Sequence, residues 1–300
     1  MKKRHKRIRK NICNAVLTVF SLLCAILFLF PTVLTITNSF MAKDEITANY
    51  GSMIDYIKND AFSIFVNDKL NLKLIPDIVS IEQYFSVLLK EPEYLMKFWN
   101  SVIIVVPIVV FQLIISLMAS YAFAMFKGRI KEIVFFFYII LMLMPYQVTL
   151  VPNYLVADKL GLLNTRCAII LPGIFSPFSV FLFTKIMKRI PVSVIEAAKL
   201  DGASHFQLFF QICIPMIKNT ILSVMLLVFI DFWNMVELPV IMLENSDYHP
   251  LSVFLSKINT DDIVLAFSVA VIYMIPPLLL FFFGEEYLVE GITYSGSVKG

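Results

Sequence analysis

Six stretches of this chain are each long and apolar enough to cross a lipid bilayer as a helix. They cover residues 12–38, 101–126, 133–156, 167–187, 219–243 and 263–284. The hydrocarbon layer is about 30 Å thick and a helix rises about 1.5 Å per residue, so a spanning helix needs roughly 20 mostly apolar residues. Because lipid cannot bond to an exposed backbone, such stretches predict an all-α membrane protein with six transmembrane helices.

The composition excludes the main alternatives. Of the 300 residues, 59% are hydrophobic and 16% are charged, whereas soluble chains average about 45–50% and about 25%. The 28 Phe rule out a disordered chain. The four Cys lie far apart and form neither a CxxC pair nor a zinc pattern, so we expect free thiols and no metal site.

The distribution of basic residues predicts the orientation. Seven of the first ten residues are Lys or Arg. With the N-terminus inside, the inner segments carry 16 Lys and Arg and the two short outer loops carry three. By the positive-inside rule both termini are cytoplasmic. The predicted regions are a basic N-terminus at 1–11, a first helix at 12–38, an extracellular loop at 41–97, a five-helix core at 98–284 and a cytoplasmic tail at 285–300.

One inner connection, residues 189–218, is far longer than a helix hairpin needs. Pro191 suits a helix start, Ser193 and Glu196 could form a capping box, and Gly202 can take the left-handed conformation that ends a helix. The pattern then starts again, with Ser204 and Gln207 as a second possible capping box and apolar residues up to Pro215. We expect two short helices here. They could present a surface to a cytoplasmic partner, or lie as an amphipathic hairpin on the lipid headgroups.

The same segment resembles the EAA loop of ABC importer permeases. Glu196-Ala197-Ala198 is followed after three residues by Gly202, and after nine more by Ile212-Cys213-Ile214-Pro215, with Ile214 in the place of a Leu. In that family the loop is the coupling helix that sits in a cleft of the ATP-binding subunit. The ATPase-coupling residues that the resemblance implies are Glu196, Ala197, Ala198, Asp201, Gly202, Ala203, Ile214 and Pro215.

The resemblance covers nearly the whole chain and is closest to the carbohydrate branch, in particular to maltose-permease G-type subunits. The matching segments are Asn100-Ser101, Ser120–Ala124, Leu160–Thr165, Leu171-Pro172, the run Glu196–Ala203, and the C-terminal Gly291–Thr293 with Gly296–Gly300. It implies the type I importer permease (MetI-like) fold. The tail residues that it assigns to contacts are Gly296, Val298, Lys299 and Gly300.

The function implied by the resemblance is that of a permease subunit in the bacterial cytoplasmic membrane, importing a sugar or oligosaccharide. None of the nine glycines is followed by Lys, so the chain has no phosphate-binding GxxxxGK[ST] loop and is expected to be neither an enzyme nor a cofactor binder. ATP would be bound by two partner ATPase subunits. The other implied partners are a second permease and an external solute-binding protein. The loop 41–97 is a candidate contact for either of them, the alternative being a structural insertion. The alternative is a secondary transporter driven by an ion gradient, although inverted repeats are not evident.

Polar residues within the membrane stretches are the candidates for a substrate path, because charges there are costly and usually face a cavity or a partner. Asp231, Asn234 and Glu237 are spaced i, i+3 and i+6 in the fifth stretch, so on one helix they would share a face. Trp233 could offer an apolar face to sugar rings. The lesser candidates are Gln112, Gln147 and Ser176. Each of these residues could instead bond to a neighbouring helix or to the paired permease.

Overall fold

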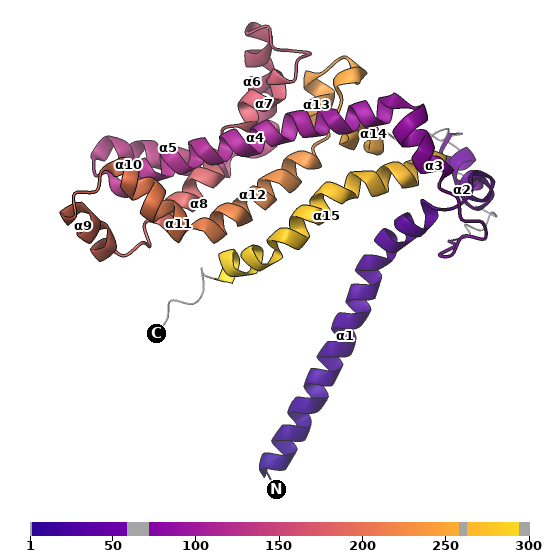
Figure 1. Ribbon diagram of the computed structural model, residues 1–300, viewed down its shortest axis with the longest axis horizontal. Coiled ribbons are helices and arrows are strands. Elements are labelled where there is room, and N and C mark those ends of the chain that lie inside the picture. Colours follow the sequence, from indigo (N-terminus) through magenta and orange to yellow (C-terminus); the bar gives the residue numbers. More distant parts are fainter. Residues whose placement is uncertain (1, 59–71, 258–262, 294–300) are drawn as a thin grey trace. The chain divides into compact units, whose positions relative to one another are not determined.

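The computed structural model describes residues 2–58, 72–257 and 263–293 (Figure 1). Within these ranges the regular elements are all helices, and the only β-pairing is an isolated bridge between Met41 and Val79. The chain divides into two compact units. The first comprises the residues up to Tyr94 together with Lys257–Ile272, and the second comprises Leu95–Ser256 together with the residues from Tyr273 onward.

The helices divide between the two units, and two of them have residues in both. In the first unit lie α1 (Lys2–Asn38), α2 (Lys43–Lys58), α3 (Glu82–Phe85) and the π-helix η1 (Ser86–Lys90). Two long helices, α4 (Pro92–Met125) and α15 (Ile263–Thr293), run from the first unit into the second. The remaining elements belong to the second unit: α5 (Arg129–Leu143), α6 (Tyr146–Lys159), α7 (Cys167–Gly173), α8 (Pro177–Met187), α9 (Val192–Leu200), α10 (His205–Gln207), the π-helix η2 (Leu208–Cys213), α11 (Ile214–Met216), α12 (Lys218–Trp233), α13 (Glu237–Met242), the 3-10 helix η3 (Ser246–Tyr248) and α14 (Leu251–Ser256).

Four stretches of the described chain are long and apolar enough to span a membrane. They are Asn11–Asn38, Pro92–Met125, Cys167–Met187 and Ile263–Tyr287. Two bent pairs raise the number to six: Arg129–Leu143 with Tyr146–Lys159, bent by 106°, and His205–Met216 with Lys218–Trp233, bent by 75°. Six spans are therefore reached when each bent pair counts as one, in agreement with the predicted number.

Two predicted spans are broken in the structure. The stretch 133–156, which Pro145 and Pro152 predict to be the least regular span, bends at Met144, whose backbone is extended (φ −73°, ψ 129°) because Pro145 follows it. The stretch 219–243, by contrast, was expected to be continuous. Instead α12 ends at Trp233, and the helical partner of α12 in the bent pair lies before it, at His205–Met216.

The core of the second unit is built from α4, α8, α12 and the connection between the last two. Its largest fully buried side chains include Trp233, Phe183, Met187 and Leu208. α8 packs against both α5 and α12, while α13 packs against α6 and α7. Gly173 of α7 allows a close approach, because an added Cβ would lie 3.0 Å from Ile108 Cδ1 and 3.1 Å from Phe232 Cε1. The helices α9, α10 and α11 lie together at one end of this unit, at the left in Figure 1.

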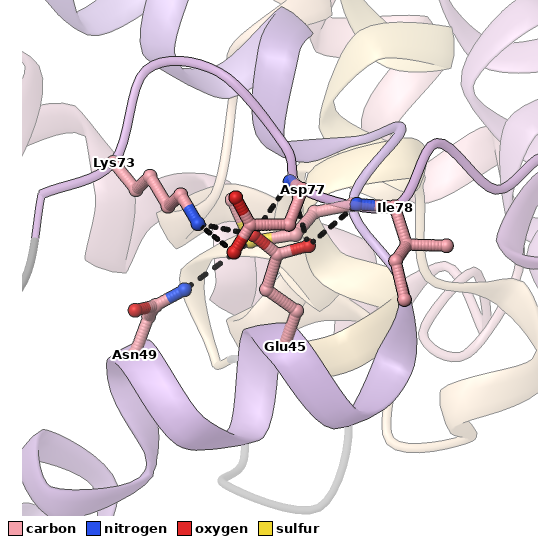
Figure 2. Close-up of polar contacts among 6 residues, drawn as sticks. Glu45, Asn49, Lys73, Asp77 and Ile78 are labelled. Carbon is pink, nitrogen blue, oxygen red and sulfur yellow. Dashed lines mark hydrogen bonds and ion pairs between the residues drawn. The ribbon is translucent and has the colours of Figure 1, made fainter.

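In the first unit, Glu45 of α2 holds the segment 72–81 against the junction of α1 and α2 (Figure 2). Its carboxylate accepts the backbone N–H groups of Asp77 (2.9 Å) and Ile78 (3.3 Å) and pairs with Lys73 Nζ (3.0 Å). Backbone bonds complete the attachment, from Ala42 N to Ile78 O (3.2 Å) and from Ser80 N to Phe40 O (2.7 Å). The N–H of Asp77 is the main cause that lowers the pKa of Glu45 from 4.5, with Lys73 and Ile78 acting in the same direction against burial.

We expect this attachment to depend on pH. The pKa of Glu45 is lower in the folded chain than in the unfolded one. The carboxylate therefore stabilises the fold at pH values above its ordinary pKa of 4.5, and this contribution is lost as the pH falls through the lowered pKa. The protection of the Asp77 and Ile78 amides against hydrogen exchange, taken relative to the intrinsic exchange rate at each pH, should therefore fall in that acidic range in the native chain. Glu45→Gln should show weaker protection already at neutral pH and no step at acidic pH. Equal acid sensitivity in the two chains would contradict the assignment.

Candidate functional site

The inner connection 189–218, called the coupling loop below, contains two short helices separated by a tight turn. α9 begins after Pro191 and ends at Asp201, and Gly202 has φ +83°. The N–H of Gly202 donates to Lys199 O (3.1 Å) and that of Ala203 to Ala198 O (2.9 Å). These two bonds form a Schellman motif. In this motif the residue after the C-cap, here Gly202, must adopt the left-handed conformation, which glycine adopts without cost. The left-handed conformation predicted for Gly202 at the end of this helix is confirmed.

The second helix of the coupling loop begins with the predicted capping box. Ser204 Oγ accepts the N–H of Gln207 (3.3 Å), and Gln207 Oε1 accepts the N–H of Ser204 (2.8 Å). The other predicted box, between Ser193 and Glu196, is wrong. Pro191 occupies the N-cap position and no side chain caps α9, so Ser193 is already inside the helix.

The coupling loop has one face packed into the core and one face open. Ile195, Leu208, Phe209 and Cys213 are buried in the cluster that includes Phe183 of α8. The exposed residues include Glu196, Ala197, Asp201 and Gly202 together with two large apolar side chains, Leu200 (88% exposed) and Phe206 (72%). Ala198, Ala203 and Ile214 are partly buried, and Pro215 is exposed in α11. Buried packing thus fixes a loop whose outer face combines charge with apolar surface, the composition of a protein-binding patch.

Glu196 is exposed and takes no part in the caps and hydrogen bonds that shape the coupling loop. No hydrogen bond or ion pair joins it to another residue within the described ranges. The caps around it are made by other groups, namely Pro191 before α9 and the Gly202 turn after it. Glu196 is therefore available to a partner without loss of any internal contact.

The three polar residues of the fifth stretch lie around a break in the helix rather than on one helical face. α12 ends at Trp233, Asn234 is its C-cap and Glu237 is the first residue of α13, so the i, i+3, i+6 geometry expected for them is corrected. All three side chains are nevertheless exposed in this single chain. The charges of Asp231 and Glu237 both act electrostatically on Tyr146, which opens α6 after the bend at Pro145. The two carboxylates thus lie within electrostatic range of the phenol, near two helix breaks.

Trp233 lies in the core and is 1% exposed. Its indole N–H donates to Tyr273 O (3.1 Å), and its ring stacks between those of Phe229 and Tyr273, with centroids 5.2 and 5.6 Å away. The Tyr273 hydroxyl in turn donates to Trp233 O and lies 2.8 Å from Asn234 Oδ1. In this conformation the indole packs against protein and ties α12 to α15, so it offers no face to a sugar ring.

The lesser candidates have different surroundings. Gln112 is 2% exposed and donates through Nε2 to Ser179 Oγ (2.9 Å), which joins α4 to α8. Ser176 caps α8 by accepting the N–H of Ser179 (3.2 Å). Only Gln147, near the start of α6, is exposed. Gln112 and Ser176 therefore serve helix packing, while Gln147 lies next to Tyr146 at the helix bend. The tail residues Gly296, Val298, Lys299 and Gly300 lie outside the described residues.

A polar network at the other end of α4 was not foreseen from the sequence. Asn100 Nδ2 donates to the carbonyls of Asp247 and His249 (2.6 and 3.2 Å), and Asn100 Oδ1 accepts from Arg166 Nη2 (2.7 Å). The Arg166 guanidinium also lies over the Tyr248 ring, 5.0 Å from its centroid. The family-like segments Asn100-Ser101 and Leu160–Thr165 could have pointed to this network, because each supplies a bond to it. Ser101 Oγ accepts the N–H of Leu251, and Asn164 Oδ1 accepts the N–H of Asn245. The network fixes the connection between α13 and α14.

Residues 112–294 match the family model described as binding-protein-dependent transport system inner membrane component. The arabinooligosaccharides transport system permease protein AraQ of Halalkalibacterium halodurans is 28% identical over 98% of this chain and 100% of its own length. The lactose transport system permease protein LacG of Rhizobium radiobacter is 31% identical over 67% of this chain and 74% of its own length.

The fold is also similar to a solved structure. A chain of a bacterial ABC transporter involved in the import of the acidic polysaccharide alginate superposes with a TM-score of 0.75 at 21% identity. The superposition covers 92% of this chain and 96% of that one. The likeness therefore extends over both units and beyond the matched family region, which begins at Gln112.

Proposed function

The chain belongs to the family of binding-protein-dependent transport system inner membrane components, and we propose that it is the permease subunit through which an ABC importer carries a sugar or oligosaccharide into the cell. It is a multi-pass membrane protein that supplies a transport route, while the ATPase is a separate subunit. One observation carries the assignment. The coupling loop is a rigid, core-packed element whose outer face, around Glu196 and Gly202, is free for a partner.

The ATPase-coupling role rests on how the coupling loop is attached. Its buried residues make it continuous with the core formed by α4, α8 and α12, so a force on its outer face moves these helices rather than a flexible loop. Glu196, Ala197, Asp201 and Gly202 form the outer face, Ala198 and Ala203 set its turn, and Ile214 with Pro215 begins the helix that leads to α12. In this proposal ATP binds to two partner ATPases and the permease itself holds no cofactor.

The remaining partners follow from the same role. The family description names a binding protein, which would deliver the sugar to the outer side of the membrane. The connection between α13 and α14, fixed by Asn100 and Arg166, and the loop 41–97 are our candidate contacts for it. A second permease would complete the pore. In this arrangement both termini are cytoplasmic, and the tail residues from Gly296 contact the ATPases.

A substrate path is proposed along the two helix breaks. Asp231, Asn234 and Glu237 are exposed there beside Tyr146 and Gln147, and carboxylates and amides are suited to bond sugar hydroxyls. We expect Asp231→Asn and Glu237→Gln each to lower sugar uptake while the complex assembles normally. Gln112→Ala, which alters a packing bond between α4 and α8, is the control for indirect effects. Unchanged uptake and unchanged ATPase coupling in both acidic variants would overturn the path and leave these residues with a packing role.

The assignment as a whole is tested by purification and binding. The tagged chain should co-purify with two ATPase subunits and a second permease, and the cognate binding protein should bind one class in a panel of neutral oligosaccharides, disaccharides and glycerol phosphates. A chain that transports alone, driven by an ion gradient, would contradict the proposal. Family membership already favours the ATP-driven importer over that alternative.

A further inference from the structure

Tyr121, near the end of α4, makes polar and ring contacts with the coupling loop. Tyr121, only 8% exposed, has its hydroxyl 2.9 Å from His205 Nδ1 and donates to His205 O at 3.1 Å. Its ring meets Phe209 edge-on, with centroids 5.2 Å apart. The Phe126 ring, one residue beyond α4, packs on the same imidazole at 4.9 Å. Tyr121 therefore touches both α10 and η2 of the coupling loop.

The two bonds of the Tyr121 hydroxyl assign the protons. A hydroxyl has one hydrogen, and a carbonyl can only accept, so that hydrogen goes to His205 O. The contact with the imidazole is then a bond from His205 Nδ1–H to the tyrosine oxygen, which requires the proton on Nδ1. Both the backbone and the side chain of His205, the first residue of α10 after the Ser204 cap, are thereby held by α4.

α4 differs from its neighbours in how it is joined to the coupling loop. α8 runs into the loop at Lys188 and α12 leaves it at Ile217, so these two helices are connected covalently. α4 is connected to it only through space. The adjacent residue Ser120 instead donates to Val180 O of α8 (2.8 Å). We propose that Tyr121 is the positioning residue that makes α4 follow the coupling loop when the ATPases move it, an inference that rests on the proposed function.

The test uses the complete importer in membranes, with the four native cysteines replaced by Ala and one reporter cysteine, Lys127→Cys, at the exposed residue just past α4. The measurement is the rate of N-ethylmaleimide labelling without nucleotide and after trapping with ATP and vanadate. Trapping should change this rate when Tyr121 is intact. Tyr121→Ala should reduce the change about twofold to thirtyfold, and Tyr121→Phe, which keeps the ring and loses one hydroxyl, about twofold to tenfold.

Matched variants separate this role from general packing. Ser120→Ala removes the neighbouring hydroxyl bond to α8 and should leave the labelling response intact. His205→Phe removes only the imidazole bond and keeps the bond from Tyr121 to the backbone carbonyl, so it should reduce the response no more than Tyr121→Phe does. The double variant should be no worse than Tyr121→Phe alone, because that change already removes both bonds. A full response in Tyr121→Ala, an equal loss in Ser120→Ala, or no response with Tyr121 intact would each overturn the inference.

A second reporter distinguishes this inference from the proposed function. Leu200→Cys lies on the outer face of the coupling loop, where its side chain is 88% exposed, and it should be shielded from labelling by bound ATPases. If Leu200→Cys were shielded but Lys127→Cys gave no response to trapping, only the role of Tyr121 would be contradicted. If Leu200→Cys were fully labelled in the presence of the ATPases, the docking role of the coupling loop would be contradicted.

Discussion

Replacing Gly202 by Val should lower ATP-driven uptake about tenfold or more while leaving the chain inserted in the membrane. Gly202 has φ +83°, and an added Cβ would meet no atom within 4 Å, so the cost of a side chain lies in the backbone and not in a clash. The left-handed conformation costs a non-glycine residue about 1–2 kcal/mol, and a β-branched residue suffers most. Because about 1.4 kcal/mol corresponds to tenfold in an equilibrium, we expect the docked form of the loop to fall about tenfold or more.

The matched control is Gly202→Asn at the same position. Asn adopts the left-handed conformation more readily than other non-glycine residues. Gly202→Asn should therefore keep most of the uptake, although it adds a polar side chain. Both variants should reach the membrane in normal amounts, since the exposed turn contributes no buried contact. If Gly202→Val were as active as the native chain, the conformation of this turn would not matter for coupling.

Glu196→Lys should release the ATPases from the importer. The carboxylate is exposed on α9 and bonds to no described residue, so its replacement leaves the fold of the coupling loop intact. A reversed charge in an interface costs both the lost pair and a new repulsion, and we expect the amount of co-purified ATPase to fall about tenfold or more. Uptake should fall in parallel, and Glu196→Gln should have a smaller effect.

Asp158→Lys provides the same change of charge at an exposed residue of α6, away from the coupling loop. ATPase binding should be unaffected in this variant. Normal ATPase recruitment in Glu196→Lys would show that the outer face of α9 is not the docking surface. Equal losses in both variants would point instead to a general effect of the added positive charge.

Local features of the coupling loop could be read from the sequence because they depend on neighbouring residues alone. The turn at Gly202 and the box of Ser204 with Gln207 formed as predicted. The box at Ser193 failed for an equally local reason, since Pro191 already begins the helix and leaves Ser193 inside it. The role of a polar residue is thus predictable where its partner lies within one turn.

The polar residues of the fifth stretch show the opposite case. An apolar stretch of the right length looks the same whether the helix runs through it or breaks, so the end of α12 at Trp233 was invisible in the pattern. Once the helix breaks, Trp233 turns into the core beside Tyr273, which lies 40 residues away in the sequence, while Asp231 and Glu237 approach Tyr146 from two different helices.

The sequence by itself determined that the chain lies in the membrane, which stretches are long and apolar enough to cross it, and where the coupling loop turns, because hydrophobic length and local capping are properties of short segments. Tertiary structure decided which residues are free to act. The contacts of Tyr121 with His205, of Asn100 with Arg166 and of Trp233 with Tyr273 each join residues about 40 to 84 positions apart. Such contacts depend on helix packing, which no local pattern encodes.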